Sequence, residues 1–445
     1  MNTLGISILC LLLFAVVVLP RRWALLAMLS GAMYLTQNQQ IDILGINMYA
    51  MRFLELAGVL RIVARREFSF FQVNQIDRAL VAVYVYTTVV YVLHFSEGQA
   101  NMIGTMVDAI FCYFICRAML RNFEEFQWFL GAFIFLLAPY IVLLWMESAT
   151  ARNPFVALGA PTETVMREGK PRCVGSFRHP SLLGTLGASF LPFYLGLCLI
   201  QVRRGVGVAG SLLCLSIAWF SNSGGPILAT GTALLGWGLW TIRDHMRLFR
   251  WGIVGFIALA ALVMKDPVWY LIAKASAISG GDGWHRSYLL DMFFRNISKW
   301  WFAGMPLEQT KDWFPYLVPV TQAADITNFF VKIGLNGGLV AIGLLIFLLY
   351  RAYAGIGMAL AGARAARDSR LVEFMLWSLG VALTVHVVNW FGITYFDQTY
   401  VLWTAQLAMA STLTQAVLAS PGEGEEEASF LSAGDEATEA VSSRA

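Results

Sequence analysis

The polar stretch between Lys265 and Asp325 concentrates side chains that could bind an anion or move a proton. Its ionisable residues include Asp282, His285, Arg286, Asp291, Arg295, Lys299 and Glu308, and it also holds Trp269, Trp284, Trp300, Trp301 and Trp313. Guanidinium groups bind phosphate and carboxylate through paired hydrogen bonds, whereas histidine and carboxylate groups accept protons near neutral pH. A polar connection of this length commonly carries function.

A second cationic stretch, 147–179, carries Arg152, Arg167, Lys170, Arg172 and Arg178. It ends in an Arg-His-Pro-Ser sequence, at 178–181, where the next apolar run begins. Proline is tolerated in the first turn of a helix, and the free N–H groups and positive dipole of that turn favour a phosphate. We therefore expect an anionic ligand here. The alternative is that a connection of this length is translocated to the outer side of the membrane whatever its charge, so that its cations need no ligand.

These stretches interrupt a chain that is otherwise apolar, with 58% hydrophobic and 13% charged residues. About thirteen runs are long enough to cross roughly 30 Å of hydrocarbon, or twelve if the first two merge. They lie near 4–20, 23–40, 43–63, 79–95, 101–120, 126–146, 180–201, 206–221, 225–242, 250–265, 325–351, 371–390 and 397–418. The sequence therefore predicts an all-α, polytopic integral membrane protein with a membrane domain over 1–418.

The arginines predict the orientation of these runs. Alternate connections carry Arg21/Arg22, Arg61/Arg65/Arg66/Arg78, Arg117/Arg121, Arg203/Arg204, Arg243/Arg247/Arg250 and Arg351/Arg364/Arg367/Arg370. Because positive charge in short loops stays cytoplasmic, the large loop 265–324 and the smaller loop 147–179 are expected on the opposite, periplasmic side. The acidic tail 419–445 is then expected to be cytoplasmic and disordered. The first run ends in two arginines and is interpreted as a retained anchor.

Composition excludes several classes of ligand. A net charge of +3 is too small to indicate nucleic acid, and the six cysteines show neither a disulfide framework nor zinc spacing. The glycine-rich pieces 223–226 and 334–338 lack a Walker lysine and a βαβ context, so the first is interpreted as a turn and the second as close helix packing. We expect no metal and no cofactor.

Ionisable residues inside the predicted runs need partners or a function. Arg52 and Glu55, three apart, are expected to meet on one helix face, either as a structural pair or along a substrate path, and Asp108 lies in the middle of a later run. Lys332 lies about two turns inside its run and could extend back to the interface.

Four elements in order resemble the O-antigen ligase and polymerase superfamily. GSFRHPS at 175–181 resembles its G-x-F-x-x-P-N helix entry, and RSYLL at 286–290 resembles its R-x3-L element. MPL at 305–307, preceded by Gly304, resembles its hPl-G stretch. TN at 327–328, continuing to GG at 337–338 and an apolar run, is similar to its H-N…G-x-x-G segment. The resemblance covers 172–350.

Membership would imply a metal-independent membrane glycosyltransferase that uses a saccharide on undecaprenyl pyrophosphate at the periplasmic face of the bacterial inner membrane. The sequence departs from the ligases at Thr327, where they carry a histidine, and at 221–226, where they carry an arginine in an S-x-S-R entry. Threonine cannot accept a proton near neutral pH. The departures favour a polysaccharide polymerase, and the resemblance extends to exopolysaccharide polymerases of the xanthan type.

Such a transfer needs cations for the departing diphosphate and a path for the acceptor proton. Arg172, Arg178 and Arg286 are the candidates for the diphosphate, with Lys332 as a fourth. The candidates for the proton are His285 and His179, each beside an arginine, and Asp282, Asp291 or Asp325. Thr327, Asn328 and Trp284 are the remaining expected substrate contacts. For His285, His179 and the tryptophans, a structural role at the membrane interface is the alternative.

The predicted function is therefore the joining of undecaprenyl-pyrophosphate-linked oligosaccharide repeats into an exopolysaccharide. Two alternatives stay open: ligase-type transfer of finished glycan to another acceptor, and a transporter or flippase of lipid-linked saccharide. A transporter predicts an internal repeat, which the sequence lacks. The expected partners are membrane lipid, the lipid-linked saccharide, a chain-length regulator and export proteins.

Overall fold

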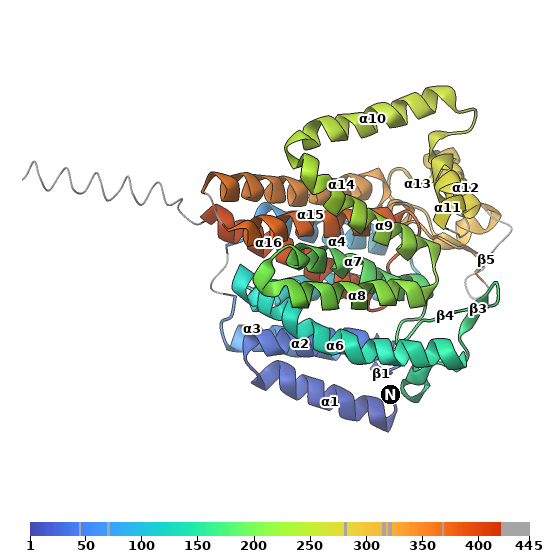
Figure 1. The fold of residues 1–445 in the computed structure, drawn as a ribbon. Helices are drawn as coiled ribbons and strands as arrows, with labels where there is room; N and C mark the ends of the chain where they lie inside the picture. Colours follow the sequence, from blue (N-terminus) through green and yellow to red (C-terminus); the bar gives the residue numbers. More distant parts are fainter. Residues whose placement is uncertain are drawn as a thin grey trace, which may run out of the picture.

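The chain folds mainly into α-helices, with short β-hairpins in some of the connections between them (Figure 1). A computed structural model describes residues 1–43, 46–68, 72–279, 283–313, 317–318, 323–366 and 369–419. Its first ten helices are α1 (Thr3–Val18), α2 (Arg21–Tyr34), α3 (Ala50–Ala64), α4 (Gln75–His94), α5 (Gln99–Met119), α6 (Phe123–Thr150), α7 (Pro180–Cys198), α8 (Arg204–Ser221), α9 (Gly224–Gly238) and α10 (Met246–Val263). Asp282 and residues 420–445 of the predicted tail lie outside the described residues.

The remaining helices are α11 (Leu271–Ser279), α12 (Gly283–Arg295), α13 (Ile297–Trp300), α14 (Phe329–Ala365), α15 (Arg370–Trp390) and α16 (Thr399–Ala419). A helix occupies most of each predicted run, and within the described part of the chain nine helical stretches are long and apolar enough to cross a membrane. This is the architecture of an α-helical, multi-pass membrane protein. Helices α2 and α3 are shorter than expected, at 14 and 15 residues, and the hairpin β1 (Gln40–Ile43) and β2 (Ile46–Tyr49) takes up the start of the third run.

Helix α7 lies at the centre of the bundle, and nearly all of its residues are buried. Small residues let its neighbours approach: a Cβ on Gly187 would lie 2.3 Å from the Cys214 carbonyl oxygen of α8, and one on Gly184 would lie 2.4 Å from Pro226 of α9. Close approach through glycine is the usual means of packing helices in membranes, where apolar burial drives little association.

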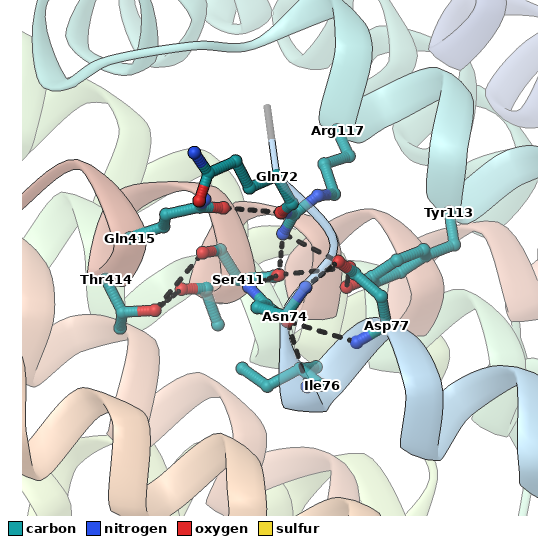
Figure 2. A network of polar contacts seen from close by, with 10 residues as sticks. Gln72, Asn74, Ile76, Asp77, Tyr113, Arg117, Ser411, Thr414 and Gln415 are labelled. Atoms are coloured by element: carbon teal, nitrogen blue, oxygen red, sulfur yellow. Dashed lines mark hydrogen bonds and ion pairs between the residues drawn. The ribbon is translucent and has the colours of Figure 1, made fainter. Parts of the chain in front are cut away.

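One end of the bundle carries most of the arginines predicted to be cytoplasmic. Figure 2 shows the fully buried Arg117 of α5 between α4 and α16, where it lies 3.2 Å from Asp77 and donates to the Gln72 carbonyl oxygen (2.8 Å). Tyr113 donates to the same Asp77 carboxylate (2.6 Å), and Arg117 also donates to Ser411. A buried charge with these partners holds three helices together at this end.

The opposite end, here called the loop end, contains the segments 151–179 and 391–398 and the described residues of 264–328. In the first segment, η1 (Pro154–Leu158) precedes the hairpin β3 (Val165–Arg167) and β4 (Lys170–Arg172). In the second, α11 to α13 are accompanied by η4 (Val268–Tyr270), η5 (Leu307–Trp313), β5 (Leu317–Val318) and β6 (Ala323–Ala324). A separate hydrophobic cluster, which includes Phe293, Trp300 and Met305, packs this second segment on the start of α14.

Helix α14 is interrupted at Gly337 and Gly338, and backbone from 264–328 fills the break. The Leu339 N–H donates to the Trp301 carbonyl oxygen, and the Met305 N–H donates to that of Leu335, both at 2.8 Å. Gly338 has φ 70° and ψ −165°, a conformation open almost only to glycine. The expected close packing by small residues is therefore present in two forms: Gly338 lies against the loop backbone, whereas a Cβ on Gly337 would lie 3.4 Å from the Cα atom of Thr87 on α4.

Candidate functional site

A cavity of about 710 Å³ lies at the loop end, between α4, α5, α14 and α16. Its wall includes Arg178, Asp325, Lys332, Asn336 and Tyr395 among mostly apolar side chains. The volume is within the usual range of small-molecule sites. An apolar wall with a few ionisable groups suits a ligand that is partly charged.

Arg178 reaches the cavity from the turn before α7 and forms an ion pair with Asp397. Its Nε donates to Asp397 Oδ2 at 2.6 Å, and a second guanidinium hydrogen bond goes to Oδ1 of the same carboxylate. The hydrogen bonds that Arg178 donates to this carboxylate raise the pKa of Arg178. The arginine is exposed, whereas the Asp397 side chain is 4% exposed. An anionic ligand would therefore have to share Arg178 with a built-in carboxylate.

Lys332 places a second cation in the cavity. It follows the N-cap Asn328 by one turn of α14, and its backbone N–H donates to the Asn328 carbonyl oxygen (3.0 Å). Within the described residues the Lys332 ammonium group has no hydrogen bond or ion pair, and the nearby Asp397 is the charge that acts on it. Unlike Arg178, this cation is not already paired with a carboxylate.

A second cationic group, formed by Arg172, His179 and Arg286, lies beside the first. The charges of Arg172 and Arg286 both act on His179, and the Arg286 guanidinium carbon lies 3.3 Å from where a Cβ on Gly392 would be. Gly392 and Asp397 belong to the same connection, 391–398, between α15 and α16. Arg178 and Arg286, both predicted to bind the diphosphate, thus lie at the same end of the bundle, although Arg286 does not line the cavity.

Two helix N-termini meet at this second group. Arg172 donates to Ser223 Oγ (3.2 Å), which lies 2.7 Å from Ser181 Oγ, so the starts of α7 and α9 are side by side. Burial and then the charges of Arg167 and Arg286 lower the pKa of Arg172. Two cations beside two helix N-termini are an arrangement that favours an anion of more than one charge.

His179 is the N-cap of α7. Its Nδ1 accepts a hydrogen bond from the Ser181 N–H (3.1 Å), so in the neutral ring Nε2 carries the proton. Burial, followed by the charges of Arg172 and Arg286, lowers its pKa to about 4. At neutral pH the geometry therefore makes His179 a hydrogen-bond donor to an anion and not a base.

The other predicted substrate contacts have mainly structural partners. His285 Nε2 lies 3.2 Å from the Asp325 carbonyl oxygen, which can only accept, and half-exposed Trp284 stacks on Tyr288 with ring centroids 4.9 Å apart. Asn328 caps α14 by accepting from the Val331 N–H (3.1 Å). Neither the Asn328 Nδ2 nor the Thr327 Oγ1 atom has a hydrogen-bond partner in the described part of the chain.

Several ionisable residues have partners that differ from the expected ones. Arg52 pairs with Asp108 of α5 (2.9 Å) and not with Glu55, which instead accepts from the Tyr400 hydroxyl of α16. Asp291 pairs with Arg295 one turn later on α12 (2.8 Å). Of the two predicted carboxylates that the structure describes, Asp325 lines the cavity and Asp291 does not.

Sequence reasoning missed a polar chain behind the cavity wall, formed by Tyr395, His386 and Gln406. His386 was overlooked because it lies within an apolar run and has no neighbouring arginine. The available signal was the polar and aromatic sequence TYFDQTY at 394–400, directly after that run.

A scan against models of known protein families finds no match, and a search of curated proteins finds no matching sequence. Within the described ranges, no group of three or more His, Cys, Asp and Glu side chains gathers where it could hold a metal ion.

Proposed function

We propose that the chain is a membrane glycosyltransferase of the O-antigen ligase and polymerase type. It would join undecaprenyl-pyrophosphate-linked oligosaccharide repeats into an exopolysaccharide at the periplasmic face of the bacterial inner membrane. One observation carries the proposal: the partly charged cavity and the second cationic group lie beside the same connection, 391–398. The order of the four motif elements in 172–350 also supports it.

The proposed chemistry follows from charge. The bond between the sugar anomeric carbon and the diphosphate oxygen breaks, the acceptor hydroxyl oxygen bonds to that carbon, and the diphosphate leaves with the electron pair. Arg172 and Arg286, with the N-termini of α7 and α9, would stabilise the charge that develops on the leaving group. Arg178 and Lys332 would hold a phosphate or sugar oxygen inside the cavity. About twelve or thirteen membrane spans and a periplasmic loop 265–324 are part of the same proposal.

The test is to replace single cations and follow polymer and lipid-linked repeats in cells that carry the matching repeat unit. We expect Arg286→Gln and Arg172→Gln to abolish polymer and to accumulate single lipid-linked repeats on the periplasmic leaflet. The matched control is Arg295→Gln on the same helix as Arg286, because the Arg295 side chain is 70% exposed and its ion pair is with Asp291, one turn earlier on the helix. Normal polymer in both site variants would overturn the proposal.

Other outcomes would identify the alternatives. If purified protein moved glycan to a lipid A core rather than to a second lipid-linked repeat, the chain would be a ligase. If the Arg286→Gln cells trapped repeats on the cytoplasmic leaflet, the chain would be a flippase.

A further inference from the structure

A chain of three polar side chains runs from the cavity wall into the bundle. Tyr395, 6% exposed, belongs to the 391–398 connection and lines the cavity, and its hydroxyl oxygen lies 2.7 Å from His386 Nδ1 of α15. His386 Nε2 lies 3.1 Å from Gln406 Oε1 of α16. Both His386 and Gln406 are fully buried.

The Gln406 oxygen determines which nitrogen of His386 carries the proton. An amide oxygen can only accept, so His386 Nε2 is the donor and Nδ1 is left as the acceptor for the Tyr395 hydroxyl. The imidazole is therefore oriented to receive the proton of Tyr395. Asn389 Nδ2 lies 3.5 Å from the same hydroxyl oxygen and can donate to it as negative charge develops there.

The Tyr395 end of this polar row lies at the cavity to which the proposed function assigns a phosphate or sugar oxygen of the substrate. Tyr395 shares the cavity wall with Arg178 and Lys332, the cations expected to hold the substrate. Among the predicted proton acceptors in the described residues, His179 uses its Nδ1 lone pair to cap α7 and Asp291 is paired with Arg295. Asp325 lines the same cavity as Tyr395 and is the alternative acceptor.

We infer that Tyr395 and His386 form the proton relay of the transfer, with Gln406 positioning the imidazole; the inference rests on the proposed function. As the acceptor hydroxyl oxygen bonds to the anomeric carbon, its proton passes to the Tyr395 oxygen and the Tyr395 proton passes to His386 Nδ1. The diphosphate leaves with the electrons of the broken bond. His386 then holds one extra proton, which returns through Tyr395 to the leaving diphosphate or to water.

The relay needs both residues together. Burial raises the pKa of Tyr395, so a free tyrosinate is disfavoured and the hydroxyl gives up its proton only as another arrives. Removing a general base usually lowers a rate by about 10²–10⁴-fold. We expect a kcat loss of that order in Tyr395→Phe and His386→Gln, with the KM for the lipid-linked substrate changed less than about threefold, because neither change removes a cation.

The experiment measures kcat, KM and the solvent deuterium isotope effect of the full-length protein in lipid nanodiscs, with a lipid-linked repeat as donor and acceptor. The matched control is Tyr353→Phe, because Tyr353 donates to or accepts from Thr384 of α15 (2.9 Å) and its loss removes a comparable hydrogen bond away from the cavity. We expect the isotope effect of wild type to be lost or altered in both relay variants and retained in the control.

Wild-type activity separates the two proposals. A wild-type protein without transfer activity would refute the proposed function, whereas an active wild type with normal kcat in Tyr395→Phe and His386→Gln would refute the relay alone. If both variants fail to fold, 3,5-difluorotyrosine at position 395 preserves the packing and lowers the phenol pKa. A kcat change of more than about threefold at 395, absent when the same residue replaces Tyr353, supports the relay; equal rates at both positions overturn it.

Discussion

The partner of each arginine at the loop end decides what its charge can do. Arg178 is held by the Asp397 carboxylate, whereas Arg172 donates to a neutral serine and lies near Arg286. Like charges held close together cost free energy, and sites that keep such groups together are often functional. The Arg172, His179 and Arg286 group is therefore a better candidate for binding a diphosphate than Arg178 alone.

The lowered pKa of His179 predicts how the stability of the protein depends on pH. Its folded pKa of about 4 is below the unfolded value of about 6.5, so the unfolded chain binds more protons between these values. The contribution of His179 to stability is therefore complete above about pH 6.5 and decreases as the pH falls toward 4. We expect His179→Asn, which keeps a capping side chain, to reduce this pH dependence.

The measurement is the thermal unfolding midpoint of detergent-solubilised protein from pH 7.5 to 4.5. His94→Asn is the control, because His94 is an exposed histidine at the end of α4. An acid-induced fall that is identical in wild type and His179→Asn would contradict the assignment.

At the scale of elements, the break in α14 connects the loop segment 264–328 to the cavity. Leu335 and Asn336 line the cavity immediately before the break, and Met305 lines it from the loop. The two backbone hydrogen bonds from the loop to the break fix these three residues relative to one another. The loop is thus a wall of the cavity and not a separate domain.

Replacing Gly338 tests this connection. In Gly338→Ala the new Cβ would lie 2.4 Å from the Phe302 carbonyl oxygen and would occupy a backbone conformation unfavourable by roughly 1–3 kcal/mol. We expect a lower unfolding midpoint and faster proteolysis between 296 and 313. Gly343→Ala on the same helix is the control, because nothing lies within 4 Å of its Cβ. Equal protease resistance in the two variants would mean that the break does not hold the loop.

At the scale of the whole molecule, polar groups divide between the two ends of an apolar bundle. The intervening surface is apolar: α10 buries no side chain and contacts chiefly η3 (Leu239–His245) and η4. Its exposed Trp251, Phe256 and Leu259 require lipid around them. In Figure 1, α10 stands apart from the bundle, on the side of α14 and α9. Its position is consistent with a helix that is surrounded by the membrane.

Labelling tests which end faces outward. Glu168 lies in the turn between β3 and β4 at the loop end, and Arg203 lies between α7 and α8 at the opposite end. In a Cys10→Ala background, we expect Glu168→Cys to react with a membrane-impermeant maleimide in cells with a permeabilised outer membrane. Arg203→Cys should react only after the inner membrane is opened, since one membrane span separates the two sites. The reverse pattern would contradict the periplasmic placement of the loop end.

The sequence by itself determined the helical class, the approximate position of each long helix and the grouping of most arginines at one end. Apolar runs and charge bias are local properties, because each segment must match the membrane independently of its neighbours. For the site, the sequence identified Arg172, Arg178, Arg286, His179 and Lys332 as loop-end residues. It could not divide them into a cavity group and a second group.

Only the tertiary structure decided the partners. Arg178 meets Asp397, 219 residues away, Arg52 meets Asp108 rather than Glu55, and Tyr395 meets His386 behind the cavity wall. Such pairs depend on which helices pack together and how each is rotated, and small residues such as Gly187 set that packing through contacts distant in the chain. A local sequence pattern shows that a buried charge needs a hydrogen-bond or ion-pair partner, whereas the packing of the bundle decides which group that partner is.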